Sequence, residues 1–219
     1  SYVIAALDYA RTKGTRTIYL VMNPTPYFNT DVDLYGYKVG KDHPTTVIAE
    51  IGINHRGDLK SAKELVLQSK LTGCEIAKIQ TFSGESRISN KAKQARYADK
   101  TLGMEETTSE MFSRFELSLD DHKKLMEYSE SIKMPLMSTP FDEKSADQLF
   151  DLGVKAFKIA SFDLVNLPFI KYVASKKIPI ILSTGMANMN EIEEAVEAVA
   201  KVQNENLIIL HCVSAYPAD

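Results

Sequence analysis

Cysteine is scarce in this chain, with two residues among 219, and the two form no C-x-x-C pair. Cys74 and Cys212 therefore give no basis for a disulfide framework, and we expect a reducing compartment, the cytoplasm. No apolar run approaches the roughly 20 residues that are needed to cross a membrane. The first residues also lack the three-part pattern of a signal peptide. These absences predict a protein without a membrane partner.

An excess of positive charge is also missing, since the formal net charge is −3. Nucleic acid is therefore not an expected partner, and any anion must be bound by local placement of charge. The four histidines show no spacing typical of a metal site, and we assign no metal ligand to this chain. His43 and His122 are expected to face solvent, His55 to lie in a loop, and His211 to be hydrogen-bonded inside a strand.

The N-terminal residues form one predicted helix-strand unit, with a helix over Tyr2–Lys13 and a strand over Thr17–Met22. Residues 25–46 contain prolines and glycines without helical periodicity, which is typical of a connector, with a short hairpin near Tyr35–Val39. We therefore predict an appendage of unknown role at residues 1–30 and a main domain at residues 31–219.

From Val47 onward, short apolar runs alternate with amphipathic segments. A long polar segment, residues 82–107, interrupts this pattern. Asp58 is predicted to cap the first helix, which buries a stripe of Ala62, Leu65, Val66 and Leu71. The predicted strands are Val47–Gly52, Glu75–Thr81, Leu136–Ser138, Ala156–Ala160, Ile178–Ser183 and Leu207–Val213. The predicted helices are Asp58–Thr72, Leu119–Ile132, Glu143–Leu152, Leu167–Lys176 and Glu191–Val202.

Continuously apolar strands separated by single helices indicate an α/β fold with a parallel sheet covered on both faces. An open doubly wound sheet and a (β/α)8 TIM barrel both satisfy this pattern. We favour the barrel, because each strand ends in polar residues that would meet at one mouth. Six strand-helix units do not close an eight-stranded barrel, so we expect an incomplete barrel that lacks the last two units. The edges of its first and last strands would then be open to association.

Two lysines stand inside apolar strands and are candidate anion ligands. Lys158 lies in A-F-K-I-A-S, and Lys78 lies in E-I-A-K-I-Q-T. A buried ammonium needs an anion to offset a desolvation cost of several kcal/mol. A lysine near a strand end also often extends into water, so Lys158 alone does not decide the question. Gln80 follows Lys78 by two residues and is expected on the same side of the strand. Together the two strands predict a site for a phosphate or a carboxylate.

Six motifs in order resemble the sialic acid synthase family of phosphoenolpyruvate-dependent synthases of nine-carbon sugar acids. The resemblance runs from about Asp33 to Asp219. Its motifs are I-A-E-I-G-I-N-H-R-G at 48–57, A-K-I-Q-T-F at 77–82, S-T-P-F at 138–141, F-K-I-A-S at 157–161, I-L-S-T-G-M-A at 181–187 and L-H-C-V-S-A-Y-P at 210–217.

The resemblance implies condensation of phosphoenolpyruvate with an N-acetylated amino sugar and release of phosphate. The sugar would be N-acetylmannosamine or a related 6-deoxy diacetamido sugar. A divalent metal, Mn²⁺ or Mg²⁺, would serve the full-length parent with ligands from the missing strands, and the parent would be a homodimer. By similarity we assign phosphoenolpyruvate binding to Lys78, Thr139, Lys158, Ser161, Ser183 and Ser214. Ammonium and hydroxyl donors in fixed positions suit a molecule that carries both a carboxylate and a phosphate.

Glu50, Lys78 and Lys158 are the catalytic candidates under this resemblance. Glu50, Gln80 and Tyr216 match positions that contact the sugar, and Glu50 would move protons as water adds to the developing oxocarbenium centre. From the residues alone, Glu50 could equally cap a helix or pair with a lysine, and Tyr216 could pack in a loop.

The sequence also departs from the family. Phe162 and Asp163 stand where many relatives have Gly-Glu, and Arg56 replaces a small polar residue. We also expect the chain to lack the family's C-terminal antifreeze-like domain. The identity of the sugar therefore stays open. Two alternatives remain: an inactive fragment that keeps the phosphate pocket, and a phosphosugar aldolase or isomerase on the same barrel that uses a Schiff-base lysine.

Overall fold

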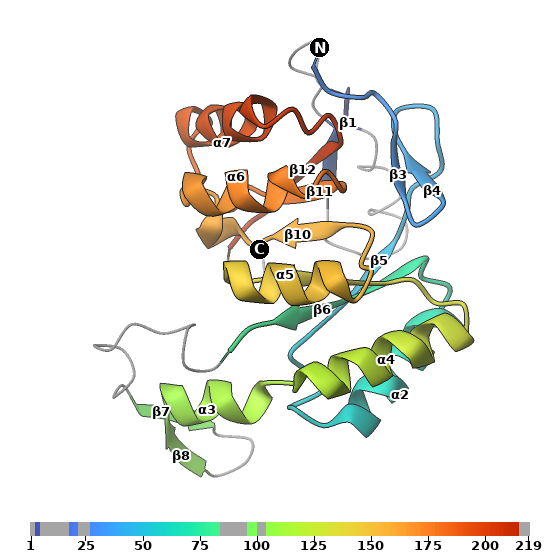
Figure 1. Ribbon diagram of the computed structural model, residues 1–219, viewed down its shortest axis with the longest axis vertical. Coiled ribbons are helices and arrows are strands. Elements are labelled where there is room, and N and C mark those ends of the chain that lie inside the picture. The colour runs from blue at the N-terminus through green and yellow to red at the C-terminus, as the bar shows by residue number, and fades with distance from the viewer. Residues whose placement is uncertain (1–2, 5–17, 22–26, 84–95, 100–103, 215–219) are drawn as a thin grey trace. The chain divides into compact units, whose positions relative to one another are not determined.

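A computed structural model describes residues 3–4, 18–21, 27–83, 96–99 and 104–214 (Figure 1). The chain divides into two compact units. One unit is Ile48–Leu152, and the other combines Ser1–Val47 with Gly153–Asp219. Each unit is described by itself below. None of the helices in the described residues is long and apolar enough to cross a membrane.

Three parallel strands form the sheet of the unit Ile48–Leu152. They are β5 (Ile48–Gly52), β6 (Ile76–Thr81) and β9 (Leu136–Pro140), and β6 pairs with the other two. Helix α2 (Leu59–Leu71) follows β5, helix α4 (Leu119–Ser131) precedes β9, and helix α5 (Glu143–Asp151) follows β9. The strands predicted from apolar runs are thus confirmed, and β9 continues two residues further than predicted.

Side-chain caps and a shared apolar core hold these helices in place. The Asp58 carboxylate accepts from the Ser61 N–H at 2.7 Å, which confirms the predicted cap of α2. Helix α2 packs against α4 and β6, and Ala62 and Val66 lie in one buried cluster with Leu125 of α4. The predicted stripe was wrong at Leu71, which is 67 % exposed because it is the last residue of the helix.

The polar segment that the sequence left without structure contains regular elements. Strand β7 (Arg96–Asp99) pairs antiparallel with β8 (Met104–Thr107), and helix α3 (Thr108–Phe115) follows directly. The Thr107 hydroxyl and the Glu110 carboxylate form a reciprocal capping box at the start of α3. Polar composition concealed β7 and β8, because their sequences, R-Y-A-D and M-E-E-T, lack the apolar alternation on which the prediction depended. Helix α3, which begins directly after this segment, was not predicted.

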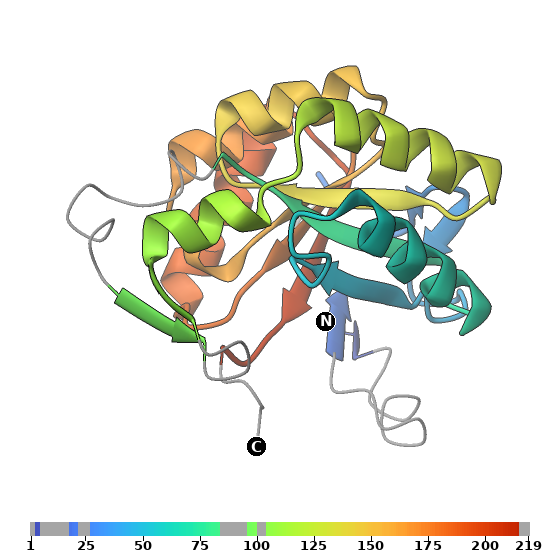
Figure 2. The ribbon, with the colours of Figure 1, turned by 90° about the horizontal axis from the view of Figure 1, so that it is seen from below.

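The second unit contains a parallel sheet of β10 (Phe157–Ile159), β11 (Ile180–Ser183) and β12 (Leu207–His211). A 3-10 turn, η1 (Ser161–Asp163), follows β10. Helices α6 (Leu167–Ser175) and α7 (Met189–Lys201) connect the three strands and pack against each other (Figures 1 and 2). All four residues of β11 are buried, as expected for the middle strand of a sheet.

Residues of the predicted appendage extend this sheet. Strand β2 (Ile18–Val21) pairs antiparallel with β12, and β1 (Val3–Ile4) pairs with β2. The predicted strand at Thr17–Met22 is confirmed in its centre, whereas the predicted helix at Tyr2–Lys13 is wrong at Val3–Ile4. Because β2 covers the outer edge of β12, the edge of the last parallel strand is not bare, contrary to our expectation. The rest of the predicted helix lies outside the described residues.

The connector contains the predicted hairpin, formed by β3 (Val32–Leu34) and β4 (Tyr37–Val39). Gly36 adopts a positive φ of 91° in its turn, a conformation that suits glycine. The Tyr35 hydroxyl accepts from the Lys155 N–H at 3.1 Å, which ties the hairpin to the segment before β10. Burial raises the pKa of the Tyr35 hydroxyl to about 12. In each unit three strands, β5, β6 and β9 or β10, β11 and β12, are parallel and lie in chain order with helices between them. The α/β class is therefore established, while closure into a barrel stays a prediction.

Candidate functional site

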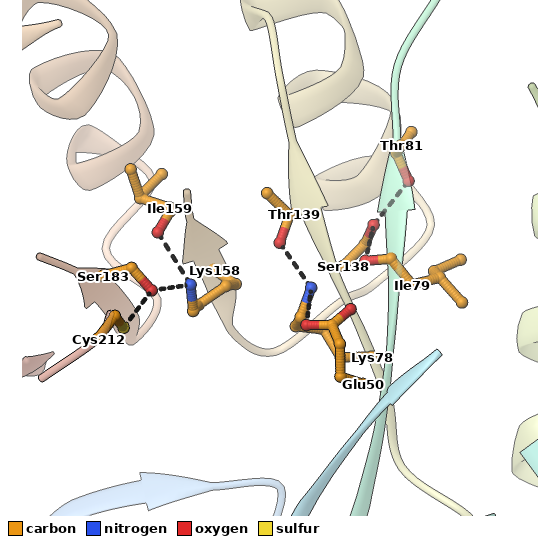
Figure 3. A network of polar contacts seen from close by, with 10 residues as sticks. All are labelled: Glu50, Lys78, Ile79, Thr81, Ser138, Thr139, Lys158, Ile159, Ser183 and Cys212. Carbon is orange, nitrogen blue, oxygen red and sulfur yellow. Dashed lines mark hydrogen bonds and ion pairs between the residues drawn. The ribbon is translucent and has the colours of Figure 1, made fainter. Parts of the chain in front are cut away.

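Lys158 is the centre of a polar cluster at the ends of β10, β11 and β12. Register places Lys158 beside Ile181, and Ser183 lies two residues further along β11 on the same face. The Lys158 ammonium donates to the Ser183 hydroxyl and to the Ile159 carbonyl oxygen, the latter at 3.1 Å (Figure 3). Lys158 is half-buried, so it neither lies fully in the core nor extends freely into water.

Cys212, Ser161 and Ser214 complete this cluster. We call these three residues, Lys158 and Ser183 the Lys158 cluster. The Cys212 Sγ lies 3.4 Å from the Ser183 Oγ (Figure 3). The Ser161 Oγ accepts from the Gly185 N–H at 3.1 Å. Sequence reasoning predicted the lysine and the three serines but missed Cys212 and Gly185. The alternation of side chains along β12, whose Leu210 pairs with Ser183, could have pointed to Cys212.

Lys78 is the centre of a second cluster, in the other unit. Its ammonium lies 2.8 Å from the Glu50 Oε2 and donates to the Thr139 Oγ1 at 3.0 Å (Figure 3). Register places Lys78 opposite Glu50, and Gln80 opposite Thr139, so these four predicted residues share one face of the sheet. We call them the Lys78 cluster.

The electrostatics of the Lys78 cluster are asymmetric. The Lys78 side chain is only 6 % exposed, whereas the Glu50 side chain is 59 % exposed. Burial lowers the pKa of the Lys78 ammonium, and the adjacent Glu50 carboxylate opposes that shift. The lysine is therefore fixed in the protein, while the carboxylate can rotate into water or towards a ligand. The alternative left open by the sequence, that Glu50 pairs with a lysine, is confirmed.

The opposite face of β6 carries a neutral hydrogen-bond network that the sequence did not predict. His122 donates from Nδ1 to the Ser118 carbonyl oxygen at 2.9 Å, so its Nε2 accepts from the Thr81 hydroxyl at 2.8 Å. The Thr81 Oγ1 in turn lies 2.7 Å from the Ser138 Oγ (Figure 3). His122 is 4 % exposed, so its predicted exposure to solvent was wrong. The i, i+4 spacing of Ser118 and His122 was the available signal.

The prediction that His55 lies in a loop is confirmed, since it stands in the turn between β5 and α2, whereas His211 and His43 differ from expectation. His55 is 1 % exposed and accepts from the Gly57 N–H at Nδ1. Burial and the nearby His122 lower the pKa of His55 to about 4. His211 is exposed at the last position of β12, so the prediction of a core histidine was wrong. His43 is half-buried, with Nε2 3.2 Å from the Asp31 carboxylate, and is thus not simply solvent-facing.

The part of the chain that the structure describes contains no recognisable metal-binding site. No group of three histidine, cysteine or acidic side chains converges there in a way that could hold one. We therefore assign no metal ligand and no metal-dependent step to these residues. Tyr216, predicted to contact the sugar, lies outside the described residues.

Comparison with known families gives the geometry its context. The model described as the NeuB family matches residues 65–219. The chain belongs to the NeuB family. The residues matched include the whole Lys158 cluster and, of the Lys78 cluster, Lys78, Gln80 and Thr139, whereas Glu50 lies outside the matched range.

Relatives within the NeuB family are named as synthases of sialic-acid-like sugars. The N,N'-diacetyllegionaminic acid synthase of Campylobacter jejuni is 43 % identical over 80 % of this chain and 53 % of its own length. The human N-acetylneuraminate-9-phosphate synthase is 35 % identical over 83 % of this chain and 50 % of its own length. The crystal structure of the sialic acid synthetase of Leptospira borgpetersenii in complex with citrate superposes with a TM-score of 0.76 at 28 % identity, over 89 % of this chain and 63 % of that one.

The similarity extends over most of this chain but not over most of its relatives. The chain spans about half the length of the curated relatives that it matches. The fold is therefore that of sialic acid synthase structures over the shared region. The activity of a complete protein and the roles of individual residues need separate tests.

Proposed function

We propose that this chain is the phosphoenolpyruvate-binding part of a synthase that makes a nine-carbon sialic-acid-like sugar acid. The complete protein would join phosphoenolpyruvate to an N-acetylated amino sugar, N-acetylmannosamine or a related 6-deoxy diacetamido sugar, and release phosphate. Membership of the NeuB family supports this class of reaction. The observation that carries the proposal is the hydrogen bond from the Lys158 ammonium to the Ser183 hydroxyl. The family resemblance assigns both residues to phosphoenolpyruvate binding.

The Lys158 cluster suits an anionic group because all of its polar side chains can donate. The Ser183 hydroxyl accepts from Lys158, and the Ser161 hydroxyl accepts from the Gly185 N–H. Each hydroxyl therefore keeps its own hydrogen for an acceptor outside the protein. Hydrogen bonds from an ammonium and from oriented hydroxyls to an oxyanion are shorter and stronger than neutral ones. A phosphate or carboxylate would satisfy these donors.

The Lys78 cluster suits a site at which charge changes during the reaction. An anion that binds to the Lys78 ammonium competes with the Glu50 carboxylate, which lies 2.8 Å away. Because Glu50 is largely exposed, it can leave Lys78 without a desolvation cost. In the proposed reaction the enol C3 of phosphoenolpyruvate bonds to the sugar aldehyde carbon, and water adds to C2 before phosphate leaves. Glu50 is the proposed carrier of a proton in these steps.

Other properties of the complete protein stay expectations from the family. They are a divalent metal ion, Mn²⁺ or Mg²⁺, a homodimeric assembly, and contacts of Gln80 and Tyr216 with the sugar. The relatives' names include legionaminic, pseudaminic and neuraminic acid derivatives, so the choice of sugar needs its own assay.

Phosphate release by the complete protein tests this proposal. We expect release only when phosphoenolpyruvate, an amino sugar and a divalent metal are all present, and we expect Lys158→Ala to abolish it. Loss of one such donor costs about 2–4 kcal/mol of transition-state stabilisation, which corresponds to roughly 30- to 1000-fold in rate. Lys171→Ala removes an exposed lysine of α6 and is the matched control. Equal turnover in the Lys158 and Lys171 variants would refute the assignment.

A further inference from the structure

Gly185 lies at the point where two serines of the Lys158 cluster converge. It lies two residues after Ser183, the last residue of β11. Its φ lies outside the left-handed region that favours glycine. Backbone conformation therefore does not require a glycine here. A different constraint must explain a residue without a side chain at this position.

The constraint is space. A Cβ atom on residue 185 would lie 2.3 Å from the Ser214 Oγ and 2.9 Å from the Ser161 Oγ. It would also lie 3.4 Å from the Cys212 Cβ. Carbon and oxygen atoms that are not bonded to each other do not approach within 3.0 Å in folded proteins. An alanine at this position would therefore displace both hydroxyls from their present positions.

The backbone of Gly185 adds a second function. Its N–H donates to the Ser161 Oγ at 3.1 Å, which fixes the oxygen and leaves the hydroxyl hydrogen to point elsewhere. The neighbouring Thr184 hydroxyl donates to the Leu210 carbonyl oxygen at 2.8 Å, and this bond joins the segment to β12. The Gly185 backbone is thus held in place by the sheet and in turn holds Ser161.

We propose that Gly185 is a positioning residue of the oxyanion site. Its N–H orients the Ser161 hydroxyl, and its missing side chain leaves room for Ser161 and Ser214 to donate to the same phosphate or carboxylate group. The proposal rests on the proposed function for the identity of the natural ligand, phosphoenolpyruvate. It does not need turnover, because it concerns binding of an oxyanion to this cluster.

Binding to the 219-residue chain tests the proposal, with phosphoenolpyruvate and inorganic phosphate as separate probes in a thermal-shift titration and in calorimetry. We expect Gly185→Ala to raise the dissociation constant for the bound probe at least tenfold. Ser214→Gly removes the closer of the two clashing oxygens. We therefore expect the double variant Gly185→Ala/Ser214→Gly to bind better than the product of the two single losses predicts. A merely structural role would not produce this rescue.

Gly73→Ala is the control for a general loss of stability. Gly73 has a φ of +85° with no atom within 4 Å of an added Cβ, so alanine strains the backbone at that position without a clash. We expect a lower melting temperature but an unchanged dissociation constant. If Gly185→Ala does not fold, the double variant is compared with Ser214→Gly instead.

The outcomes separate the two proposals. Unchanged binding in Gly185→Ala, or single losses that simply multiply in the double variant, would overturn the role of Gly185. A chain that binds inorganic phosphate but not phosphoenolpyruvate would overturn the proposed function, and Gly185 would then be judged on phosphate. A chain that binds neither probe would overturn both.

Discussion

Replacement of Lys78 by methionine should separate binding from stability. Removal of one partner from a buried ion pair usually costs 3–5 kcal/mol, because it leaves an unpaired charge in the core. That penalty does not apply here, since the remaining partner, Glu50, is 59 % exposed. The lost ion pair is worth about 0–1 kcal/mol and the lost bond to Thr139 about 1 kcal/mol. The variant also no longer carries the cost of burying the Lys78 ammonium, and this raises its free energy of unfolding by several kcal/mol.

We therefore expect Lys78→Met to lower the free energy of unfolding by no more than about 2 kcal/mol, and net stabilisation is consistent with these contributions. Phosphoenolpyruvate at 100 times its dissociation constant should stabilise the unsubstituted chain by about 2.7 kcal/mol and the variant not at all. Urea unfolding with and without ligand measures both quantities. Lys123→Met, an exposed lysine on α4, is the control and should keep the ligand effect. Full ligand stabilisation in Lys78→Met, or a loss above about 3 kcal/mol without ligand, would refute the reasoning.

Three further predictions concern the remaining titratable and buried groups. The folded chain holds the pKa of His55 at about 4, below that of the unfolded chain, so its stabilising effect is present above about pH 6.5 and is lost as the pH falls towards 4. Urea unfolding between pH 7.5 and 4.5 should therefore show a steeper decline of the unfolding free energy in wild type than in His55→Gln. Parallel curves for the two proteins would contradict this. Thr81→Val leaves the Nε2 of buried His122 without its donor and should cost about 1–3 kcal/mol of unfolding free energy, whereas a neutral result would exclude the hydrogen bond. Lys158 donates to two oxygen acceptors, as an ammonium does, so borohydride with a ketose phosphate should leave its mass unchanged; a reduced adduct on Lys158 would support an aldolase instead.

The sequence predicted the parallel strands well because their apolar runs leave little choice of structure. Every strand predicted from Val47 onward is present, with bounds that shift by at most two residues. The prediction that a lysine inside an apolar strand pairs with an anion is confirmed for Lys78, whose ammonium lies beside the Glu50 carboxylate, whereas the Lys158 ammonium donates to the Ser183 hydroxyl and the Ile159 carbonyl oxygen. The reason is physical: an ammonium inside an apolar strand must be compensated.

Other features depend on contacts between distant segments and could not be predicted. His122 stands on a charged helix, and only the packing of α4 places its ring against Thr81 of β6. The pairing of β2 with β12 joins segments that are nearly the whole chain apart. Gly185 is ordinary in the sequence, and its importance becomes visible only when Ser161 and Ser214 are placed around it.

The two faces of β6 have a consequence for how this protein can change. Lys78 and Gln80 point to one side, while Ile79 and Thr81 point to the other, so the strand serves the ligand cluster and the helix layer in alternate positions. Deletion of a single codon of β6 ahead of Lys78 would exchange the two sides, placing the lysine among the helices and the apolar Ile79 opposite Glu50. A change in the length of this strand would therefore disrupt the Lys78 cluster and the packing of β6 against the helices in the same event.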